Sequence, residues 1–388
     1  MSFPTKKLKE ISVIRTGKLD SNAAVQDGLY PFFTCDPQTL SINEWAYDTE
    51  AVLLAGNNAS GNYTAKYYSG KFNAYQRTYI IETADKNILN VRFLCYALNQ
   101  QLKLLKTMSS GSTTKFLTIR MLHDLDIPFP DITIQNRIVG VLGTIDDLIE
   151  NNQKQINLLE EAAQRLYKEW FIDLRFPGHE STSIVNGLPE GWEKGKIINY
   201  FTTVLGGTPS RANKEYWGGN IRWINSGEVN KLRIIKESEF ISELGLKKSA
   251  TKLMPVHTTV LAITGATLGQ VSYTEIETCA NQSVVGIYDQ QKVYSEYIYL
   301  AVSNEIKSII SKATGGAQQH INKDIVNSFE IMLPSADAND QFKAIISPLF
   351  TKITDCYITI EKLSEARDRL LPKLMNGELE VNNAAYHS

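Results

Sequence analysis

The stretch IQNRIVGVLGTIDDLIENNQKQINLLEEAAQRLYKEW, from Ile134 to Trp170, carries apolar residues at alternating spacings of four and three. This spacing predicts a long helix with one narrow apolar stripe, as in a coiled-coil seam. At a rise of about 1.5 Å per residue, the helix is about 55 Å long. The predicted seam consists of Ile138, Leu142, Ile145, Ile149, Asn152, Ile156, Leu159 and Leu166, with Asn152 as its polar interruption.

The same pattern returns near the C-terminus, interrupted only by Arg367. Because each narrow stripe would be exposed on a lone helix, we predict that the two helices pack on each other, antiparallel about a pseudo-twofold axis. The alternative is that each helix packs back on its own globular segment. The second seam consists of Ile346, Leu349, Ile353, Cys356, Ile360, Leu363, Arg367 and Leu370.

Polar residues inside such seams commonly fix the register of the two helices. If the seam centres, near residues 154 and 360, face each other, Arg367 lies opposite Asp146 and Asp147. We therefore predict an ion pair between Arg367 and these carboxylates. The alternative is an arginine that extends its charged end into solvent from the edge of the seam.

The two halves of the chain resemble each other. VLLAG at 52–56 is similar to VLAITG at 260–265, and AYQR at 74–77 is similar to ANQS at 280–283. In both halves, short β-branched and aromatic runs are separated by Gly, Asn, Ser and Pro, and one helix is expected before the last strand, at 91–107 and 295–312. The sequence therefore predicts an α+β fold built twice. The predicted parts are globules at 1–130 and 192–334, long helices within 131–173 and 335–380, a linker at 174–191 and a tail at 381–388.

Composition limits the class of protein. A chain of 388 residues is long enough for two domains, and no run reaches the roughly 18 apolar residues of a membrane span. The four cysteines and five histidines are scattered, without the C-x-x-C spacing of a zinc site. The net charge of −2 hides globules that lean slightly positive and helices that lean negative. These features predict a soluble cytoplasmic protein without a metal site.

Sequence signatures of catalysis are absent. The segment GNNASGNY at 56–63 has the glycines of a phosphate-binding loop, but Asn62 stands where its lysine should be. We find no Asn-Pro-Pro-aromatic segment, no glycine-rich nucleoside-binding turn and no recognisable Ser-His-Asp triad. A non-catalytic protein is therefore favoured.

Several strings, in this order, resemble the specificity subunit of type I restriction-modification systems. They are GGTPSR at 206–211, EYWGGNIRWINSGEVN at 215–230 and the helix end LLPKLMNGEL at 370–379. In the first globule, DGLYPFFTCD at 27–36 and GKFNAYQRTYII at 70–81 are similar to a version of that family's first target-recognition domain. The first globule departs from the second because it has RTGKLDSNA in place of the GGTPS segment.

The resemblance implies a division of labour. Each target-recognition domain would read one half of an asymmetric, bipartite site in double-stranded DNA. The paired spacer helices would set the distance between the half-sites and dock two methyltransferase subunits, which in turn bind motor-nuclease subunits. S-adenosylmethionine, ATP and Mg²⁺ would bind to those partners and no cofactor to this chain, with adenine N6 as the methylated position. Its setting would be the cytoplasm of a bacterium or archaeon.

Candidate DNA contacts are sought on loops that differ between the globules and hold cationic or amide side chains beside small residues. Arginine and lysine suit guanine or phosphate, and glutamine suits adenine. Gln76 and Gln282 could equally satisfy buried backbone groups. The candidates are Lys71, Gln76, Arg77, Thr113, Thr114 and Lys115 in the first globule, and Ser210, Arg211, Lys214, Gln282, Gln318, Gln319 and His320 in the second.

Three other functions remain open at this point. The first is a stand-alone tandem-domain DNA-binding protein such as a repressor. The second is an enzyme with a cryptic site, for instance a nuclease. The third is a scaffold that binds proteins and no nucleic acid.

Overall fold

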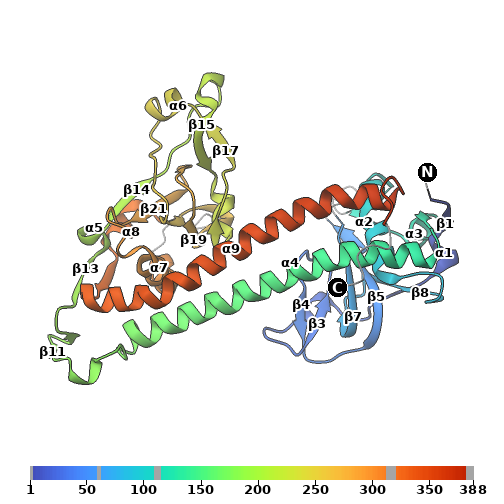
Figure 1. The fold of residues 1–388 in the computed structure, drawn as a ribbon, viewed down its shortest axis with the longest axis horizontal. Helices are drawn as coiled ribbons and strands as arrows, with labels where there is room; N and C mark the ends of the chain where they lie inside the picture. The colour runs from blue at the N-terminus through green and yellow to red at the C-terminus, as the bar shows by residue number, and fades with distance from the viewer. Residues whose placement is uncertain (1–2, 59–62, 109–114, 312–319, 382–388) are drawn as a thin grey trace. The chain divides into compact units, whose positions relative to one another are not determined.

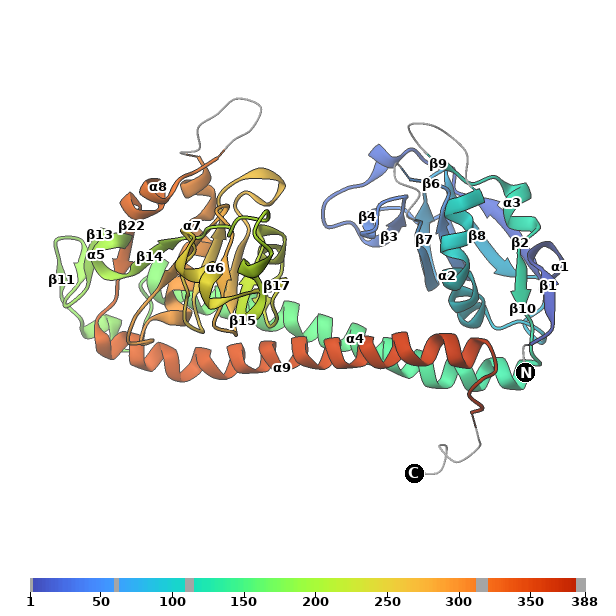
Figure 2. The ribbon, with the colours of Figure 1, turned by 90° about the horizontal axis from the view of Figure 1, so that it is seen from above.

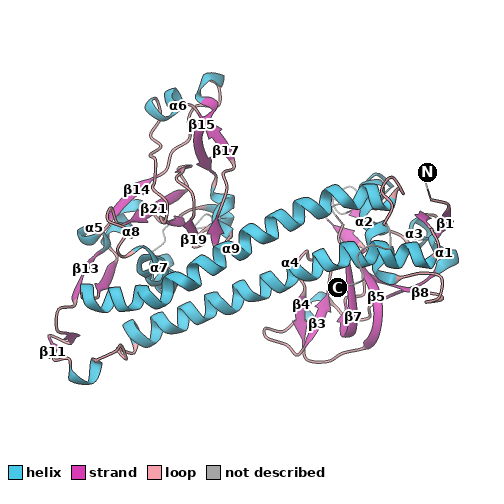
Figure 3. Cartoon of the chain, in the orientation of Figure 1, coloured by secondary structure: helices cyan, strands magenta, loops and turns pink. Residues whose placement is uncertain are grey.

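The structure, a computed structural model, describes residues 3–58, 63–108, 115–311 and 320–381. The chain forms two compact units, Met1–Ile149 with Lys362–Ser388 (unit 1) and Glu150–Glu361 (unit 2). Each unit contains one globular part and a stretch of each long helix (Figure 1). Helices and strands occur together in both globular parts (Figure 3), as the predicted α+β class requires.

Globule 1 is built on a six-stranded sheet in the order β2-β8-β5-β7-β3-β4. Its centre is β5, whose residues 51–55 are all buried. Helix α2 (Val91–Met108) packs across β5 and β7. Figure 2 shows α2 beside β7. The strands are β2 (Ser12–Thr16), β3 (Tyr30–Phe33), β4 (Leu40–Ile42), β5 (Tyr47–Ala55), β7 (Ala65–Ala74) and β8 (Thr78–Thr83).

Globule 2 repeats this topology with a five-stranded sheet in the order β14-β21-β18-β19-β16. Strand β16 runs parallel to β19, just as β3 runs parallel to β7 in globule 1. Helix α7 (Ser295–Ile310) corresponds to α2, so both helices predicted before the last strand are confirmed. The strands are β14 (Thr202–Leu205), β16 (Arg233–Ile234), β18 (Thr259–Ala262), β19 (Val271–Thr274) and β21 (Val284–Tyr288).

Smaller elements also occur in matching pairs. A two-stranded sheet joins the start of each globule to its last strand, β1 to β10 in globule 1 and β13 to β22 in globule 2. The predicted tandem repeat is therefore confirmed in the fold. These elements are β1 (Thr5–Lys7), α1 (Leu8–Ile11), α3 (Ile119–His123) and β10 (Asp126–Pro128), and β13 (Glu193–Lys196), α5 (Ile197–Tyr200), α8 (Lys323–Ser328) and β22 (Glu330–Leu333).

The globules differ in their additions. Globule 2 carries a second sheet in the order β17-β15-β20, and globule 1 carries a short pair, β6 with β9. Because of these additions, equivalent residues of the two globules are not separated by one constant number of residues along the chain. The added elements are β15 (Trp217–Ile224), β17 (Glu239–Ile241), α6 (Glu243–Lys247), β20 (Cys279–Ala280), β6 (Asn57–Asn58) and β9 (Lys115–Phe116).

The two predicted long helices are α4 (Ile132–Tyr167), which continues as a π-helical turn over Lys168–Ile172, and α9 (Ala336–Met375). The Asp131 carboxylate accepts hydrogen bonds from the first free backbone N–H groups of α4, at Thr133 and Ile134. Every residue of the two predicted seams is buried or half-buried.

The seams pack in two ways. In unit 2, Ile156 of α4 forms a buried cluster with Ile353 and Cys356 of α9. In unit 1, Ile138 and Leu142 of α4 belong to the core of globule 1, together with the last turn of α9. The predicted packing of the two helices on each other is confirmed. Each helix also covers a globule, because the apolar faces are broader at the helix ends.

Each unit separately shows the antiparallel pairing. In unit 2, the Trp170 ring lies 5.5 Å from the Phe342 ring, at the end of α4 and the start of α9. In unit 1, Asp146 of α4 meets Arg367 near the end of α9. Higher residue numbers in one helix therefore face lower numbers in the other.

The segment predicted as a linker is ordered. Its Phe176 ring packs 4.9 Å from the Trp192 ring, and both are buried in the core of globule 2. Strands β11 (Ile184–Val185) and β12 (Leu188–Pro189) form a hairpin around Asn186 and Gly187. Both turn residues have positive φ, which Asn-Gly adopts readily in two-residue hairpins.

Candidate nucleic-acid interface

Both globules have a glycine at the same place, where the loop after β2 or β14 packs against segment 74–77 or 280–283. We call this place the recognition edge of each globule. The Gly17 N–H donates to the Thr78 carbonyl at 3.1 Å, and the Gly206 N–H donates to the Val284 carbonyl at 2.9 Å. A Cβ atom at either glycine would collide with backbone oxygens of the segment opposite, at Ala74 or Asn281. The predicted contact segments 74–77 and 280–283 are thus held directly against the loops that follow β2 and β14.

In globule 1 this edge brings together three of the predicted residues. Gln76 is exposed, and the Arg77 guanidinium lies 5.4 Å from the Phe116 ring. The Arg77 carbonyl accepts from the Gly56 N–H at the end of β5, next to the strand pair β6 and β9 that contains Lys115. The exposed side chains of Gln76 and Arg77 therefore lie beside the backbone of Lys115.

Lys71 lies elsewhere in globule 1. It is on β7 opposite Asp48, near the start of β5, whereas Arg77 contacts the end of that strand. The Lys71 ammonium group lies 4.6 Å from the ring of the exposed Trp45. The structure therefore does not group Lys71 with Gln76 and Arg77.

In globule 2 the edge brings Gln282 and His320 together. The Gln282 side-chain oxygen accepts from the Thr208 hydroxyl at 2.5 Å, which joins it to the loop that carries Ser210. The next residue along, Ser283, accepts from the Ile263 N–H, and the neighbouring Thr264 pairs with His320 as a β-bridge. The side chains of Gln282 and His320 are exposed, so Gln282 does not satisfy a buried backbone group.

Arg211 is held by two neighbours on this side of globule 2. Its guanidinium donates to both carboxylate oxygens of Glu239, at 2.6 and 2.7 Å, and lies 3.5 Å from the Trp217 ring. Hydrogen bonds from Arg211 lower the pKa of the Glu239 carboxyl. The exposed Ser210 precedes Arg211, and the exposed Lys214 begins a short 3₁₀ helix at 214–216.

The predicted residues Thr113, Thr114, Gln318 and Gln319 lie outside the described residues. Sequence reasoning also missed the aromatic partners Trp45, Phe116 and Trp217, each of which lies against a candidate cation. Arg77 and Phe116 are far apart in the sequence, so their contact also depends on the fold. For the two tryptophans, the pairing depends on contacts between different strands and loops.

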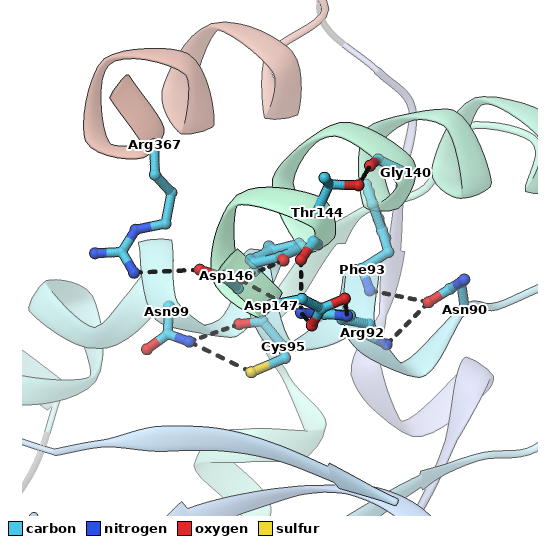
Figure 4. Close-up of polar contacts among 12 residues, drawn as sticks. Asn90, Arg92, Phe93, Cys95, Asn99, Gly140, Thr144, Asp146, Asp147 and Arg367 are labelled. Carbon is cyan, nitrogen blue, oxygen red and sulfur yellow. Dashed lines mark hydrogen bonds and ion pairs between the residues drawn. The ribbon is translucent and has the colours of Figure 1, made fainter. Parts of the chain in front are cut away.

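An ionic network fastens globule 1 to the helices (Figure 4). Asp146 of α4 accepts from the Tyr96 hydroxyl of α2 at 2.5 Å and from Arg367 of α9 at 3.2 Å. The predicted pair of Arg367 with Asp146 is confirmed. The predicted pair with Asp147 is wrong, because Arg92 of α2 occupies that carboxylate at 2.7 Å.

We expect Tyr96→Phe to lower the free energy of unfolding by about 1.5–3 kcal/mol, the usual contribution of a hydrogen bond to a charged group. Tyr96 is buried, and its burial raises the pKa of the hydroxyl, which therefore stays protonated and donates to Asp146. Chemical denaturation measures the change, with Tyr30→Phe at a half-exposed position of the same globule as control. Equal stability of both variants would contradict this role of the network.

A second network fastens globule 2 to the helices. Glu160 of α4 accepts from the Tyr299 hydroxyl of α7 at 2.7 Å and from Arg233 of β16 at 3.4 Å. The Arg233 side chain is fully buried, with its guanidinium 4.8 Å from the Tyr299 ring and 4.3 Å from the Phe350 ring of α9. One carboxylate and one guanidinium therefore join the sheet, α7 and both long helices.

No helix in the described part of the chain has the length and apolar character to cross a membrane. Among the same residues, no group of three or more His, Cys, Asp or Glu side chains is arranged to hold a metal ion.

The fold and these edges define a tandem protein with two related α+β recognition modules and one antiparallel helix pair. The profile of the type I restriction modification DNA specificity domain matches residues 2–161 and again 189–362. The chain therefore belongs to this family.

Curated relatives and a solved structure agree with this assignment. The chain is 38% identical over 165 residues to the EcoDI specificity subunit of Escherichia coli, covering 42% of this chain and 36% of that protein. It is 30% identical over 285 residues to the MjaIX specificity subunit of Methanocaldococcus jannaschii, covering 71% and 66%. The chain thus spans less than two thirds of either relative. The crystal structure of a type I system S subunit from M. genitalium has the same fold, with a TM-score of 0.65, 16% identity and 96% coverage of both chains.

Proposed function

We propose that this chain is the DNA sequence-specificity subunit of a type I restriction-modification complex. Each globule reads one half of an asymmetric, bipartite site in double-stranded DNA. The observation that carries the proposal is one edge built twice with different side chains. Glutamine stands at the first of two matching positions in both globules, Gln76 and Gln282. The second position differs, with Arg77 in globule 1 and Ser283 in globule 2. Different side chains at a matching position of the same fold are suited to recognising different half-sites.

The chemistry of these side chains fits base recognition. Glutamine pairs in a bidentate way with adenine N6 and N7, and arginine with guanine O6 and N7. The net charge of −2 gives the chain little general attraction for phosphate. We therefore infer that partner subunits supply much of the phosphate contact, and that this chain supplies the sequence information.

The long helices are the proposed docking elements for two methyltransferase subunits, through which motor-nuclease subunits join the complex. In unit 2, their exposed faces carry Leu158, Ile345 and Ile358, which are 66%, 47% and 37% exposed. In this proposal, a methyltransferase subunit covers these side chains on assembly. In this proposal S-adenosylmethionine, ATP and Mg²⁺ bind to the partners, and this chain contributes no catalytic residue.

DNA binding by the purified chain, with and without methyltransferase subunits, tests this function. We expect the affinity for a cognate duplex to rise at least about tenfold on assembly, because partner contacts with phosphate add to the affinity. Fluorescence anisotropy measures both states, and a duplex with scrambled half-sites is the control.

Other outcomes would point to other functions. Nanomolar binding by the chain alone, with no gain on assembly, would indicate a stand-alone DNA-binding protein. Metal-dependent cleavage by the isolated chain would indicate an enzyme. An assembled complex that does not crosslink to DNA would indicate a protein scaffold.

A further inference from the structure

The Arg211 guanidinium is fixed in both position and plane. Its terminal nitrogens Nη1 and Nη2 donate end-on to the two oxygens of Glu239, and its flat face stacks 3.5 Å from the Trp217 ring. The Trp217 indole N–H in turn donates to the Ser210 carbonyl at 3.3 Å. The side chains of Arg211 and Glu239 are nevertheless 55% and 43% exposed. Exposed ion pairs contribute little stability, so this geometry suggests another purpose.

End-on pairing leaves one edge of the guanidinium available. An arginine has five N–H donors, and the bonds to Glu239 use one on each terminal nitrogen. Among the described residues, Nε of Arg211 has no hydrogen-bond partner. Nε and the second hydrogen of Nη2 lie on one edge, with the parallel geometry that pairs with guanine O6 and N7.

The ion pair between Arg211 and Glu239 also disfavours contact with a phosphate group of DNA. The Glu239 carboxylate lies 2.6 Å from the guanidinium and neutralises its charge, so a phosphate would meet a pair with no net charge. Guanine offers two neutral acceptors and is not repelled by the neighbouring carboxylate. The pair therefore favours contact with a base over contact with the DNA backbone.

The location is next to the recognition edge of globule 2. The Trp223 indole N–H donates to the Gly207 carbonyl at 3.0 Å, and Thr208 donates to Gln282. The loop from Gly207 to Arg211 therefore joins the edge with Gln282 to the added sheet that carries Trp217 and Glu239. Trp217 and Glu239 lie in the β15–β17 sheet, which globule 1 lacks. They would therefore contribute to recognition of the second half-site alone.

We propose that Arg211 reads a guanine in the half-site of globule 2 through its Nε and Nη2 edge, and that Glu239 and Trp217 are its positioning residues. This inference rests on the proposed function. It adds the base class, the donor edge and the two residues that orient it.

The test uses the complex reconstituted with methyltransferase subunits. Binding is measured against a panel of duplexes in which each base pair of the mapped site is changed in turn, at several salt concentrations. The variants are Arg211→Ala, Arg211→Lys and Glu239→Gln. The matched control is Arg222→Ala, which removes a cation that pairs with Glu237 on the same added sheet at 3.4 Å.

We expect Arg211→Ala to reduce discrimination at one G·C pair by about tenfold to a hundredfold, with the other positions unchanged. Lysine lacks the planar fork, so Arg211→Lys should not restore that discrimination. Glu239→Gln should weaken discrimination at the same base pair, because it loosens the orientation of Arg211. The slope of log affinity against log salt should stay constant in the double variant Arg211→Ala with Glu239→Ala, which removes the ion pair without changing the net charge. Arg222→Ala should leave the discrimination intact.

Two results would overturn the inference. One is full discrimination at every base pair in Arg211→Ala. The other is a uniform loss of affinity in the double variant Arg211→Ala with Glu239→Ala, with a salt slope smaller by about 0.9, the change expected for one lost phosphate contact. A wild-type complex without any sequence preference would instead defeat the proposed function itself, so the two failures are distinguishable.

Discussion

Replacing Arg233 with alanine is expected to lower the free energy of unfolding of unit 2 by about 3–5 kcal/mol, the usual cost of removing one partner from a buried ion pair. The Arg233 side chain is fully buried and that of Glu160 is 6% exposed. Without Arg233, the Glu160 carboxylate stays buried with the Tyr299 hydroxyl as its hydrogen-bond donor. The loss of stability should mainly weaken the packing of globule 2 against α4 and α9.

Hydrogen exchange and chemical denaturation measure this effect. The control is Arg165→Ala, which removes an exposed partner of Glu161 on the same helix and should change stability by less than about 0.5 kcal/mol. A double variant, Arg233→Met with Glu160→Met, should recover part of the loss, since the buried Glu160 carboxylate is removed together with its partner. Glu275, which lies 3.9 Å from Arg233, keeps its hydrogen bond from the Thr354 hydroxyl. If Arg233→Ala were as stable as the control, the network would not fasten globule 2 to the helices.

The second large effect is expected for Gly206→Val. The new side chain would collide with the backbone oxygens of Ala280 and Asn281, so the loop after β14 and the segment with Gln282 must separate. The hydrogen bond from Thr208 to Gln282 should be lost with them. Overpacking of this kind lowers the free energy of unfolding by about 1–3 kcal/mol. Because Gln282 would leave its position, we also expect the affinity for cognate DNA to fall by about tenfold to a hundredfold, the usual effect of losing a bidentate base contact.

Ala212→Val in the same loop is the control, because that side chain is exposed and should change affinity little. Gly17→Val makes the matching change in globule 1, where the collision is with Ala74 and Tyr75. DNA binding by the assembled complex compares the three variants. Wild-type affinity in Gly206→Val would show that the edge does not contact DNA.

Periodicity predicted the helices better than it predicted their partners. The 4-3 spacing located α4 and α9, and the facing seam centres predicted the contact of Arg367 with Asp146. Spacing along one helix says nothing of a third element, however. For that reason Arg92 of α2, which takes Asp147, was not foreseen.

The networks and the recognition edge show the same limit. In the sequence KLRIIK, Arg233 resembles an ordinary surface cation, and only the fold reveals the Tyr299 and Phe350 rings around it. Arg211 was predicted from its loop, but Glu239 is 28 residues away and could not be paired with it. Contacts between elements that are distant in the sequence depend on the three-dimensional fold, which the spacing of residues within one segment does not encode.

The central claim is that each globule reads its own half of a divided DNA site. The most direct test maps the bases methylated by the reconstituted complex on random-sequence DNA, with the wild-type chain and with Gly206→Val. The account predicts two different defined segments separated by a fixed number of undefined base pairs. In the variant, the sequence preference should be lost in only one of the two segments. A single contiguous motif, or equal loss of both segments, would contradict it.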